Sequence, residues 1–299
     1  MTFLDLGERL RRYADVETIS PLAVWEAMAA PTATTIPWDK VWRAAKPVLS
    51  RLLPWIPPVL LLIVWQFAAS AGWISSRILP APADVARAAW SLARSGELVT
   101  HVQVSAARAL AGLAIGGSLG LAFGLLTGTS RVAESLLDST IQMLRNIPAL
   151  ALIPLVILWF GIDESAKLFL ISVAVFFPIY INTYHGIRNV DPGLIEMGRS
   201  YGLTRWQLYR QVILPGALSS ILVGLRFSLG LMWVILIVAE TISAQAGIGY
   251  LTMNAREFLQ TDVVLVGILL YAALGKLADT AARALERYWL RWHPGYQPR

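Results

Sequence analysis

Six apolar stretches recur along this sequence, and each is about as long as a helix that crosses a lipid bilayer. A hydrocarbon core about 30 Å thick needs roughly 20 apolar residues in a helix, which rises about 1.5 Å per residue. Charged residues, Pro or Gly bound each stretch. The pattern predicts an all-α integral membrane protein with about six transmembrane helices, at residues 54–71, 104–127, 136–160, 166–187, 217–242 and 263–282.

The third apolar stretch differs from the others because it contains two prolines, Pro148 and Pro154. A proline lacks the N–H that the interior of a helix uses for its hydrogen bonds, and its ring clashes with the preceding turn. We therefore expect this span to be kinked or split into two parts instead of running straight.

The composition agrees with a membrane protein. Of the 299 residues, 56% are hydrophobic and 15% are charged, and the mean hydropathy is +0.59. An average soluble domain has about 25% charged residues. Because the chain has no Cys and only three scattered His residues, disulfides and thiol chemistry are excluded and no metal site is expected.

Lys and Arg residues lie mostly on one side of the predicted topology. The segments on the side of both termini hold 16 of the 25 Lys and Arg residues, and the other side holds five when Lys167, at the outer edge of the fourth span, is counted with it. Cytoplasmic segments are enriched in Lys and Arg, so both termini are expected in the cytoplasm. Because this topology accounts for much of the net charge of +6, nucleic-acid binding is the weaker explanation of the basic composition.

Residues 1–50 have a mixed polar composition that sets them apart from the transmembrane domain, residues 51–299. Leu4, Leu6 and Leu10 fit one side of a short amphipathic helix, and a linker rich in Pro, Thr and Ala follows. We expect a loosely ordered cytoplasmic tail or a helix on the membrane surface, and a regulatory or docking role is the alternative.

Two segments on the side opposite the termini also have helical patterns. Residues 82–94 predict an amphipathic helix that Pro82 and Asp84 open, and the loop at residues 243–262 contains a short polar helix. Each segment either packs on the bundle or contacts a protein outside the cytoplasm.

The connection between the fourth and fifth spans, residues 188–216, is longer than a reversal of direction requires. Its sequence predicts a short helix through Tyr201, a break at Gly202, where a left-handed backbone costs little, and a second helix that ends near Pro215. Two short helices that meet at an angle form a rigid protrusion, which can transmit a push from a soluble partner.

This connection resembles the coupling motif of ABC importer permeases, which reads Glu-Ala-Ala, three residues, Gly, nine residues and Ile-x-Leu-Pro. Met197 and Gly198 stand at the two Ala positions, and Val212 stands at the Ile position. The resemblance implies that the segment couples ATP hydrolysis on another subunit to opening of the transmembrane pathway. An ordinary interfacial helical hairpin is the alternative. The residues implied in coupling are Glu196, Met197, Gly198, Tyr201, Gly202, Leu203, Leu214 and Pro215.

The resemblance extends over roughly residues 50–295. Over this range the sequence is similar to the nitrate, sulfonate, taurine and bicarbonate branch of these permeases. Within that branch the aliphatic sulfonate permeases are most similar, so an aliphatic sulfonate is the expected solute and taurine or nitrate are the alternatives. The segments that carry this similarity are residues 143–148, 152–163, 230–233, 238–243 and 253–262.

This resemblance implies a type I importer permease fold in the bacterial inner membrane. The implied complex contains a second copy of this chain, two subunits that bind ATP and Mg, and a periplasmic solute-binding protein. The chain itself has no Gly-x4-Gly-Lys-Ser/Thr sequence, so we expect a non-catalytic subunit without a cofactor of its own. A passive channel is an alternative, and so is a membrane enzyme, although neither His-Glu-x-x-His nor Gly-x-Ser-x-Gly occurs.

The second apolar stretch contains glycines at every fourth position. Overlapping Gly-x-x-x-Gly steps remove the side chains from one face of a helix and let another backbone approach closely. The stripe predicts a helix-packing face, whose partner is either a helix of the same chain or one of a second copy. Its members are Gly112, Gly116, Gly120, Gly124 and Gly128.

Ionisable residues within the spans are candidates for the transport pathway, because charges at mid-bilayer cost at least about 2.5 kcal/mol and normally face a cavity or a partner. Arg145 and Arg226 lie at similar predicted depths and could bind a passing sulfonate, or they could have structural partners. Glu240 is a candidate for an outer gate at an interfacial position where burial costs little. Lys276 and Asp279 are expected to form an ion pair one turn apart.

Overall fold

The computed structural model of this chain describes residues 53–292, so the predicted N-terminal extension lies outside the described residues. The chain divides into two units after Leu61, within α4 (Ile56–Ser70). The described part of the first unit is the single turn η1 (Leu53–Trp55) and the first turns of α4, whose side chains are exposed. All further helices belong to the second unit.

Five helices in the described part of the chain are long and apolar enough to cross a membrane, and one bent pair of helical segments makes six if the pair counts as one span. Each of the five contains an apolar window that spans most of the roughly 30 Å hydrocarbon core. The prediction of an all-α membrane protein with about six spans is confirmed. Besides α4, the long helices are α6 (Glu97–Thr129), α10 (Glu164–Arg188), α13 (Leu214–Ser243) and α15 (Thr261–Trp289).

The bent pair occupies the third predicted span and turns by 82°. Pro148 has an extended backbone at the turn and precedes η3, so the predicted split is found at this proline. Pro154 does not break its helix, because it lies in the first turn, where no backbone N–H is needed. The segments before the turn are α7 (Arg131–Ala133), the π-helix η2 (Glu134–Asp138) and α8 (Ser139–Leu144), and those after it are η3 (Ala149–Leu152) and α9 (Ile153–Phe160).

The glycine stripe of α6 packs against α10 of the same chain. A methyl group added at Gly116 would lie 2.1 Å from the backbone oxygen of Ser172, and one added at Gly120 would lie 2.6 Å from that of Phe176. The other three stripe glycines also face α10 side chains. The two helices therefore approach so closely that no α6 side chain fits at the stripe positions from Gly112 to Gly128.

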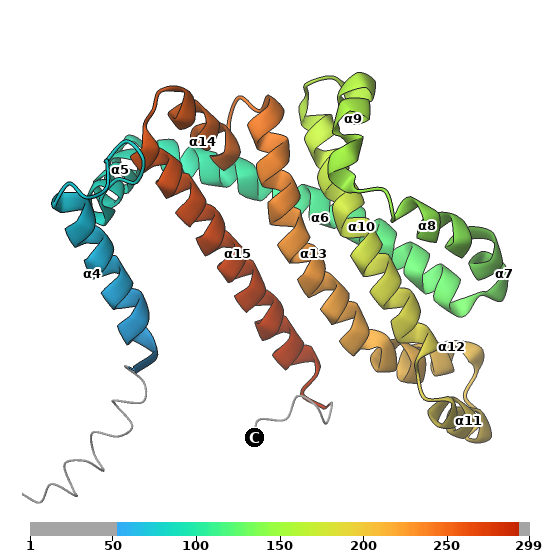
Figure 1. Cartoon of the computed structure of the whole chain (residues 1–299). Helices are drawn as coiled ribbons and strands as arrows, with labels where there is room; N and C mark the ends of the chain where they lie inside the picture. The colour runs from blue at the N-terminus through green and yellow to red at the C-terminus, as the bar shows by residue number, and fades with distance from the viewer. Residues whose placement is uncertain (1–52, 293–299) are drawn as a thin grey trace, which may run out of the picture. The chain divides into compact units, whose positions relative to one another are not determined.

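Helix α10 lies between α6 and α13, and α15 lies beside α13 (Figure 1). The core between these helices is apolar and includes Ile171 and Val175 of α10 and Leu236 of α13, all fully buried. The predicted amphipathic helix forms α5 (Pro82–Ser95), which contacts α15 and α6 and buries Val85. The loop after α13 holds α14 (Ile248–Glu257), which contacts α13 and α15.

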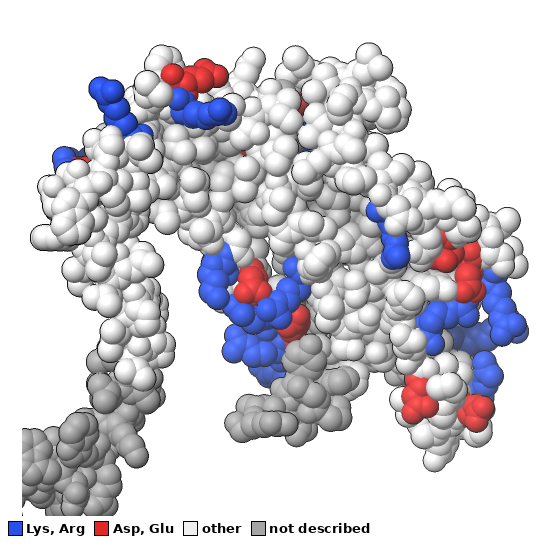
Figure 2. All heavy atoms as spheres, in the orientation of Figure 1, with Lys and Arg blue, Asp and Glu red and all other residues white. Residues whose placement is uncertain are grey.

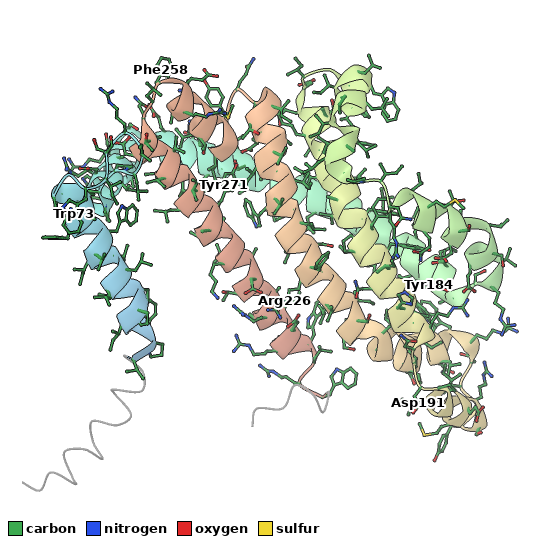
Figure 3. The ribbon with its side chains drawn as sticks, viewed as in Figure 1. Trp73, Tyr184, Asp191, Arg226, Phe258 and Tyr271 are labelled. Carbon is green, nitrogen blue, oxygen red and sulfur yellow. The ribbon has the colours of Figure 1, made fainter. Side chains whose placement is uncertain are left out.

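Charged side chains concentrate toward the two ends of the long helices. On the face in Figure 2, Lys, Arg, Asp and Glu gather over α5 and α14, along the lower half of α15 and around α7 and α11 (Pro192–Ser200). Figure 3 labels one residue at each end, Phe258 just after α14 and Asp191 just before α11. We refer to these as the α14 end and the α11 end.

Candidate functional site

The elbow, residues 191–215, is the segment that resembles the coupling motif, and it begins with a firmly capped helix. Helix α11 starts at the cap Asp191, whose carboxylate accepts a hydrogen bond of 2.8 Å from the backbone N–H of Gly193. It ends at Gly202, which has a φ of +80°. The N–H groups of Gly202 and Leu203 donate to the carbonyls of Arg199 and Gly198, at 2.9 and 3.0 Å. This is a Schellman cap, so the predicted left-handed break at Gly202 is present.

A second cap follows the Schellman cap directly. Thr204 accepts from the backbone N–H of Gln207 through its hydroxyl, and the Gln207 side chain accepts from the backbone N–H of Thr204 at 2.9 Å. This capping box opens α12 (Arg205–Leu208). Because both sides of the turn are hydrogen-bonded, the angle between α11 and α12 is held by backbone bonds on one side and by the capping side chains on the other.

The second helix of the elbow does not end near Pro215, and that prediction was wrong. Helix α12 continues through the π-helix η4 (Tyr209–Ile213) into α13, with Pro215 in the first turn of α13. The wider π turn changes the hydrogen-bond spacing before the proline, so the missing N–H of Pro215 does not interrupt the helical path. The elbow is thus joined to a membrane-spanning helix without a loop.

The elbow has a buried inner face and an exposed outer face. Gly198 is buried, and a methyl group there would lie 2.7 Å from Leu208, so its small size serves packing within the chain. The outer face carries apolar side chains that are 45%, 49% and 82% exposed, namely Leu194, Met197 and Tyr201.

Arg226 of α13 has structural partners on α15. Its Nε donates to Asp279 at 2.9 Å, and its Nη1 lies 3.8 Å from Glu286 (Figure 3). Arg283 pairs with the other carboxylate oxygen of Asp279 at 2.7 Å. The expected pair of Lys276 with Asp279 is not formed, because Arg226 and Arg283 occupy both carboxylate oxygens.

Arg145 lies in the break between α8 and η3. It shares no ion-pair partner with Arg226 among the described residues. Its side chain is exposed, and no acidic side chain among residues 53–292 lies within ion-pair distance of it. It lines a cavity of about 380 Å³ between the break, α10 and α13. The two arginines, which have similar predicted depths in the sequence, therefore differ in the structure: Arg226 has acidic partners and Arg145 lines a cavity.

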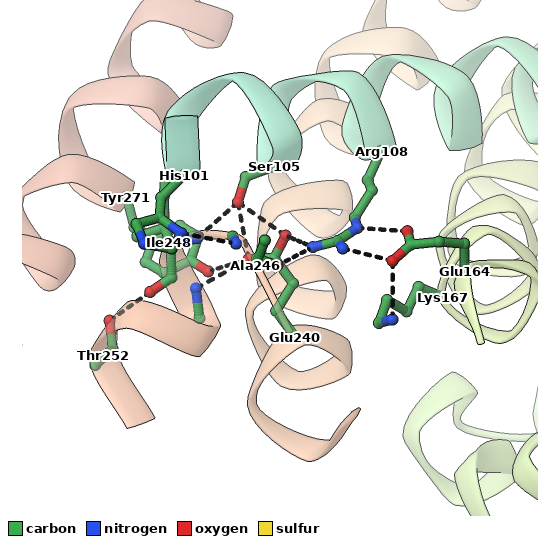
Figure 4. A network of polar contacts seen from close by, with 12 residues as sticks. His101, Ser105, Arg108, Glu164, Lys167, Glu240, Ala246, Ile248, Thr252 and Tyr271 are labelled. Carbon is green, nitrogen blue, oxygen red and sulfur yellow. Dashed lines mark hydrogen bonds and ion pairs between the residues drawn. The ribbon is translucent and has the colours of Figure 1, made fainter. Parts of the chain in front are cut away.

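Glu240 is fully buried, so the expectation that it lies at an interface with little burial cost was wrong. Its carboxylate oxygens accept hydrogen bonds from Nη1 of Arg108 and Oγ of Ser105 at 2.8 Å and from the hydroxyl of Tyr271 at 3.1 Å. The backbone N–H of Gly249 donates another at 2.9 Å. Several donors thus compensate one buried charge (Figure 4).

Arg108 extends this network from α13 to α10. Its Nε and Nη2 each donate to Glu164 at 2.6 Å, and Lys167 donates to the same carboxylate at 3.1 Å. Its Nη1 also donates to the backbone oxygen of Ala246 at 2.5 Å. We call Ser105, Arg108, Glu164, Glu240 and Tyr271 the polar clamp, because together they join α6, α10, α13 and α15 at the α14 end.

The clamp was not expected from the sequence. Arg108 lies within an apolar stretch and is therefore a visible signal, but its partners are 56 and 132 residues away. The clamp also holds the start of α14, because the N–H of Ile248 donates to Ser105 and that of Gly247 donates to His101, at 2.8 and 3.1 Å. The arrangement is suited to fixing helices and a loop, since every polar group named has a partner.

The comparisons with known proteins agree with this architecture. Residues 119–291 match the family described as binding-protein-dependent transport system inner membrane components. A protein of Escherichia coli (strain K12) named as an aliphatic sulfonates transport permease is 66% identical over 248 residues, which cover 83% of this chain and 94% of that protein. The taurine transport system permease protein of the same organism is 37% identical over 238 residues, which cover 78% of this chain and 86% of that protein.

A solved structure points to the same fold. The crystal structure of an amino acid ABC transporter with histidines matches this chain with a TM-score of 0.51 and 19% identity, over 65% of this chain and 96% of that one. At this identity the likeness concerns the fold alone. From the family match and the fold together, this chain belongs to the inner membrane components of binding-protein-dependent transport systems, the permease subunits of ABC importers.

Proposed function

We propose that this chain is the membrane-spanning subunit through which an ATP-driven importer moves aliphatic sulfonates from the periplasm to the cytoplasm. The observation that carries the proposal is the elbow, a doubly capped protrusion with an exposed apolar face that continues directly into α13. We infer the solute class from the 66% identical protein, which is named as an aliphatic sulfonates transport permease. Taurine is the runner-up.

The elbow is the proposed contact with a separate ATP-hydrolysing subunit. Leu194, Met197 and Tyr201 are spaced three and four residues apart. Leu194 and Met197 therefore share one face of α11, and Tyr201, the C-cap residue, extends that face by one turn. Exposed apolar faces of this kind support contact with another protein. ATP and Mg are bound by that subunit, and the work of its closure passes through the elbow to α13 without an intervening loop.

The proposed orientation has both termini and the elbow in the cytoplasm. It is supported by the excess of Lys and Arg in the segments on that side, 16 against five. A solute-binding protein then docks at the α14 end, in the periplasm. The working complex has two copies of this chain, two ATP-binding subunits and one binding protein.

The contact with the ATPase is tested by charging the outer face of α11 without weakening the helix. Leu194→Asp is suited to this, because an acidic residue in the first turn of a helix is favourable. We expect the variant to lose co-purification with the ATPase and solute-stimulated ATP hydrolysis. Val132→Asp is the matched control, since Val132 is also exposed and in the first turn of a helix, α7, outside the elbow.

Unchanged ATPase binding by Leu194→Asp would overturn the proposed coupling role. Uptake into proteoliposomes tests the rest of the proposal. Transport by a complex with an inactivated ATPase would indicate a passive channel. Uptake of taurine in preference to alkanesulfonates would replace the proposed solute and leave the coupling role in place.

A further inference from the structure

The cavity beside Arg145 combines one cation with apolar walls. Its volume is about 380 Å³, near the lower end of the roughly 300 to 1,000 Å³ that small-molecule sites occupy. Among the described residues that line it, Arg145 is the single charged side chain and Asn182 the single amide. The remainder are apolar, with Phe177 and Phe227 as the largest.

The cavity lies midway along the membrane-spanning helices. Phe177 and Pro178 are near the middle of α10, and Phe227 and Leu231 are near the middle of α13. The break between α8 and η3 forms the remaining wall. A ligand there would be at the depth where an importer must hand its solute across the membrane.

Arg145 is charged at this depth without a neutralising partner. Arginines at mid-membrane face a water-filled cavity or an anionic group, because contact with lipid chains is too costly. Arg226 is neutralised by Asp279 and Glu286, whereas no carboxylate in the described part of the chain pairs with Arg145. The positive charge at the cavity is therefore available to an anion.

We propose that this cavity is a transmembrane binding site for an aliphatic sulfonate, with the sulfonate at Arg145 and the alkyl chain against Phe177, Phe227 and Leu231. The assignment rests on the proposed function, because it takes the solute class from there. A planar guanidinium donates to two oxygens of one oxyanion, and the apolar wall removes the alkyl chain from water.

Direct binding tests the site separately from transport. The assembled complex of permease and ATPase is placed in lipid nanodiscs without a binding protein, and binding of radiolabelled pentane-1-sulfonate is measured at equilibrium. We expect saturable binding that Arg145→Gln weakens by at least about tenfold, the loss of a charge-assisted contact. Arg145→Lys keeps the charge and is expected to retain most of the affinity.

The apolar wall is tested with competitors and one further variant. Unlabelled pentane-1-sulfonate should compete better than methanesulfonate, and Ala149→Phe, which fills part of the cavity, should remove that preference. Binding that is absent, or equal in the wild type and Arg145→Gln, overturns the site. Alkanesulfonate uptake by the wild-type complex with its binding protein is measured in parallel, so a failure of the proposed function is recognised independently.

Discussion

Nη1 of Arg108 donates a hydrogen bond of 2.8 Å to the carboxylate of Glu240, and neither side chain is more than 7% exposed. These residues lie on α6 and α13 and are 132 positions apart in the chain. Around them the polar clamp satisfies each remaining polar atom of the Glu240 carboxylate. The α14 ends of these helices are thereby held together, while the elbow lies at their other ends.

Removing only one member of the Arg108–Glu240 pair should destabilise the protein more than replacing both members with apolar residues. Glu240→Leu leaves the buried Arg108 without its innermost partner, and single losses of this kind cost about 3–5 kcal/mol. The double variant Arg108→Met with Glu240→Leu removes both charges and should be more stable than Glu240→Leu alone. Thermal unfolding of the purified protein, followed by tryptophan fluorescence, checks this order, and additive losses would contradict it.

The glycine stripe provides a second prediction with a control on the same helix. Gly116→Ala would bring a methyl group to 2.1 Å from the backbone of α10, so the helices must separate. We expect a lower unfolding temperature and less assembled protein in the membrane. At Gly117 the nearest atom is the end of the Ile179 side chain at 3.3 Å, which can move, and Gly117→Ala should be tolerated. Equal effects of the two variants would contradict the close contact.

The fold was largely predictable because its main determinant is local. Apolar length alone identifies the spans, and the four-residue spacing of the glycines identifies a packing face, although not its partner. The path around Pro148, Pro154 and Pro215 was harder to predict. A proline interrupts a helix only where its N–H would have been used, and that depends on where each helix starts.

A third prediction concerns Gly202 and tests whether its left-handed bend is needed for coupling. Its φ of +80° costs an L-residue about 1–2 kcal/mol, so Gly202→Ala should weaken the Schellman cap and reduce solute-stimulated ATP hydrolysis. Gly202→Asn should retain more activity, because Asn adopts this conformation more readily. The two variants are compared as assembled complexes at matched protein amounts.

A methyl group at Gly202 would meet no atom of the described chain within 4 Å, so the loss in Gly202→Ala comes from the backbone and not from a clash. Gly230→Ala is the control, because that glycine is in the middle of α13 and also has open space around it. If Gly202→Ala and Gly230→Ala both behaved as the wild type, the bend at Gly202 would not matter for coupling.

The candidate site was predicted only in part, and the reason is the distance between partners in the chain. The elbow depends on neighbours in sequence, such as Thr204 with Gln207, and its outline was visible. The partners of Arg226 and Glu240 are residues of other helices, far away in the sequence. Their charge marked them as needing partners, but a single sequence does not reveal whether that partner is a solute or Asp279 and Arg108.

The central claim, an elbow in the cytoplasm where an ATPase can bind it, is tested by labelling from one side of the membrane. The natural chain has no Cys, so Arg205→Cys in the elbow and Phe258→Cys at the α14 end each carry a single thiol. Both positions are exposed. We predict that a membrane-impermeant maleimide labels Arg205→Cys only in inside-out vesicles and Phe258→Cys only from the outside of intact spheroplasts. Labelling of Arg205→Cys from the outside would contradict the orientation and, with it, the coupling role.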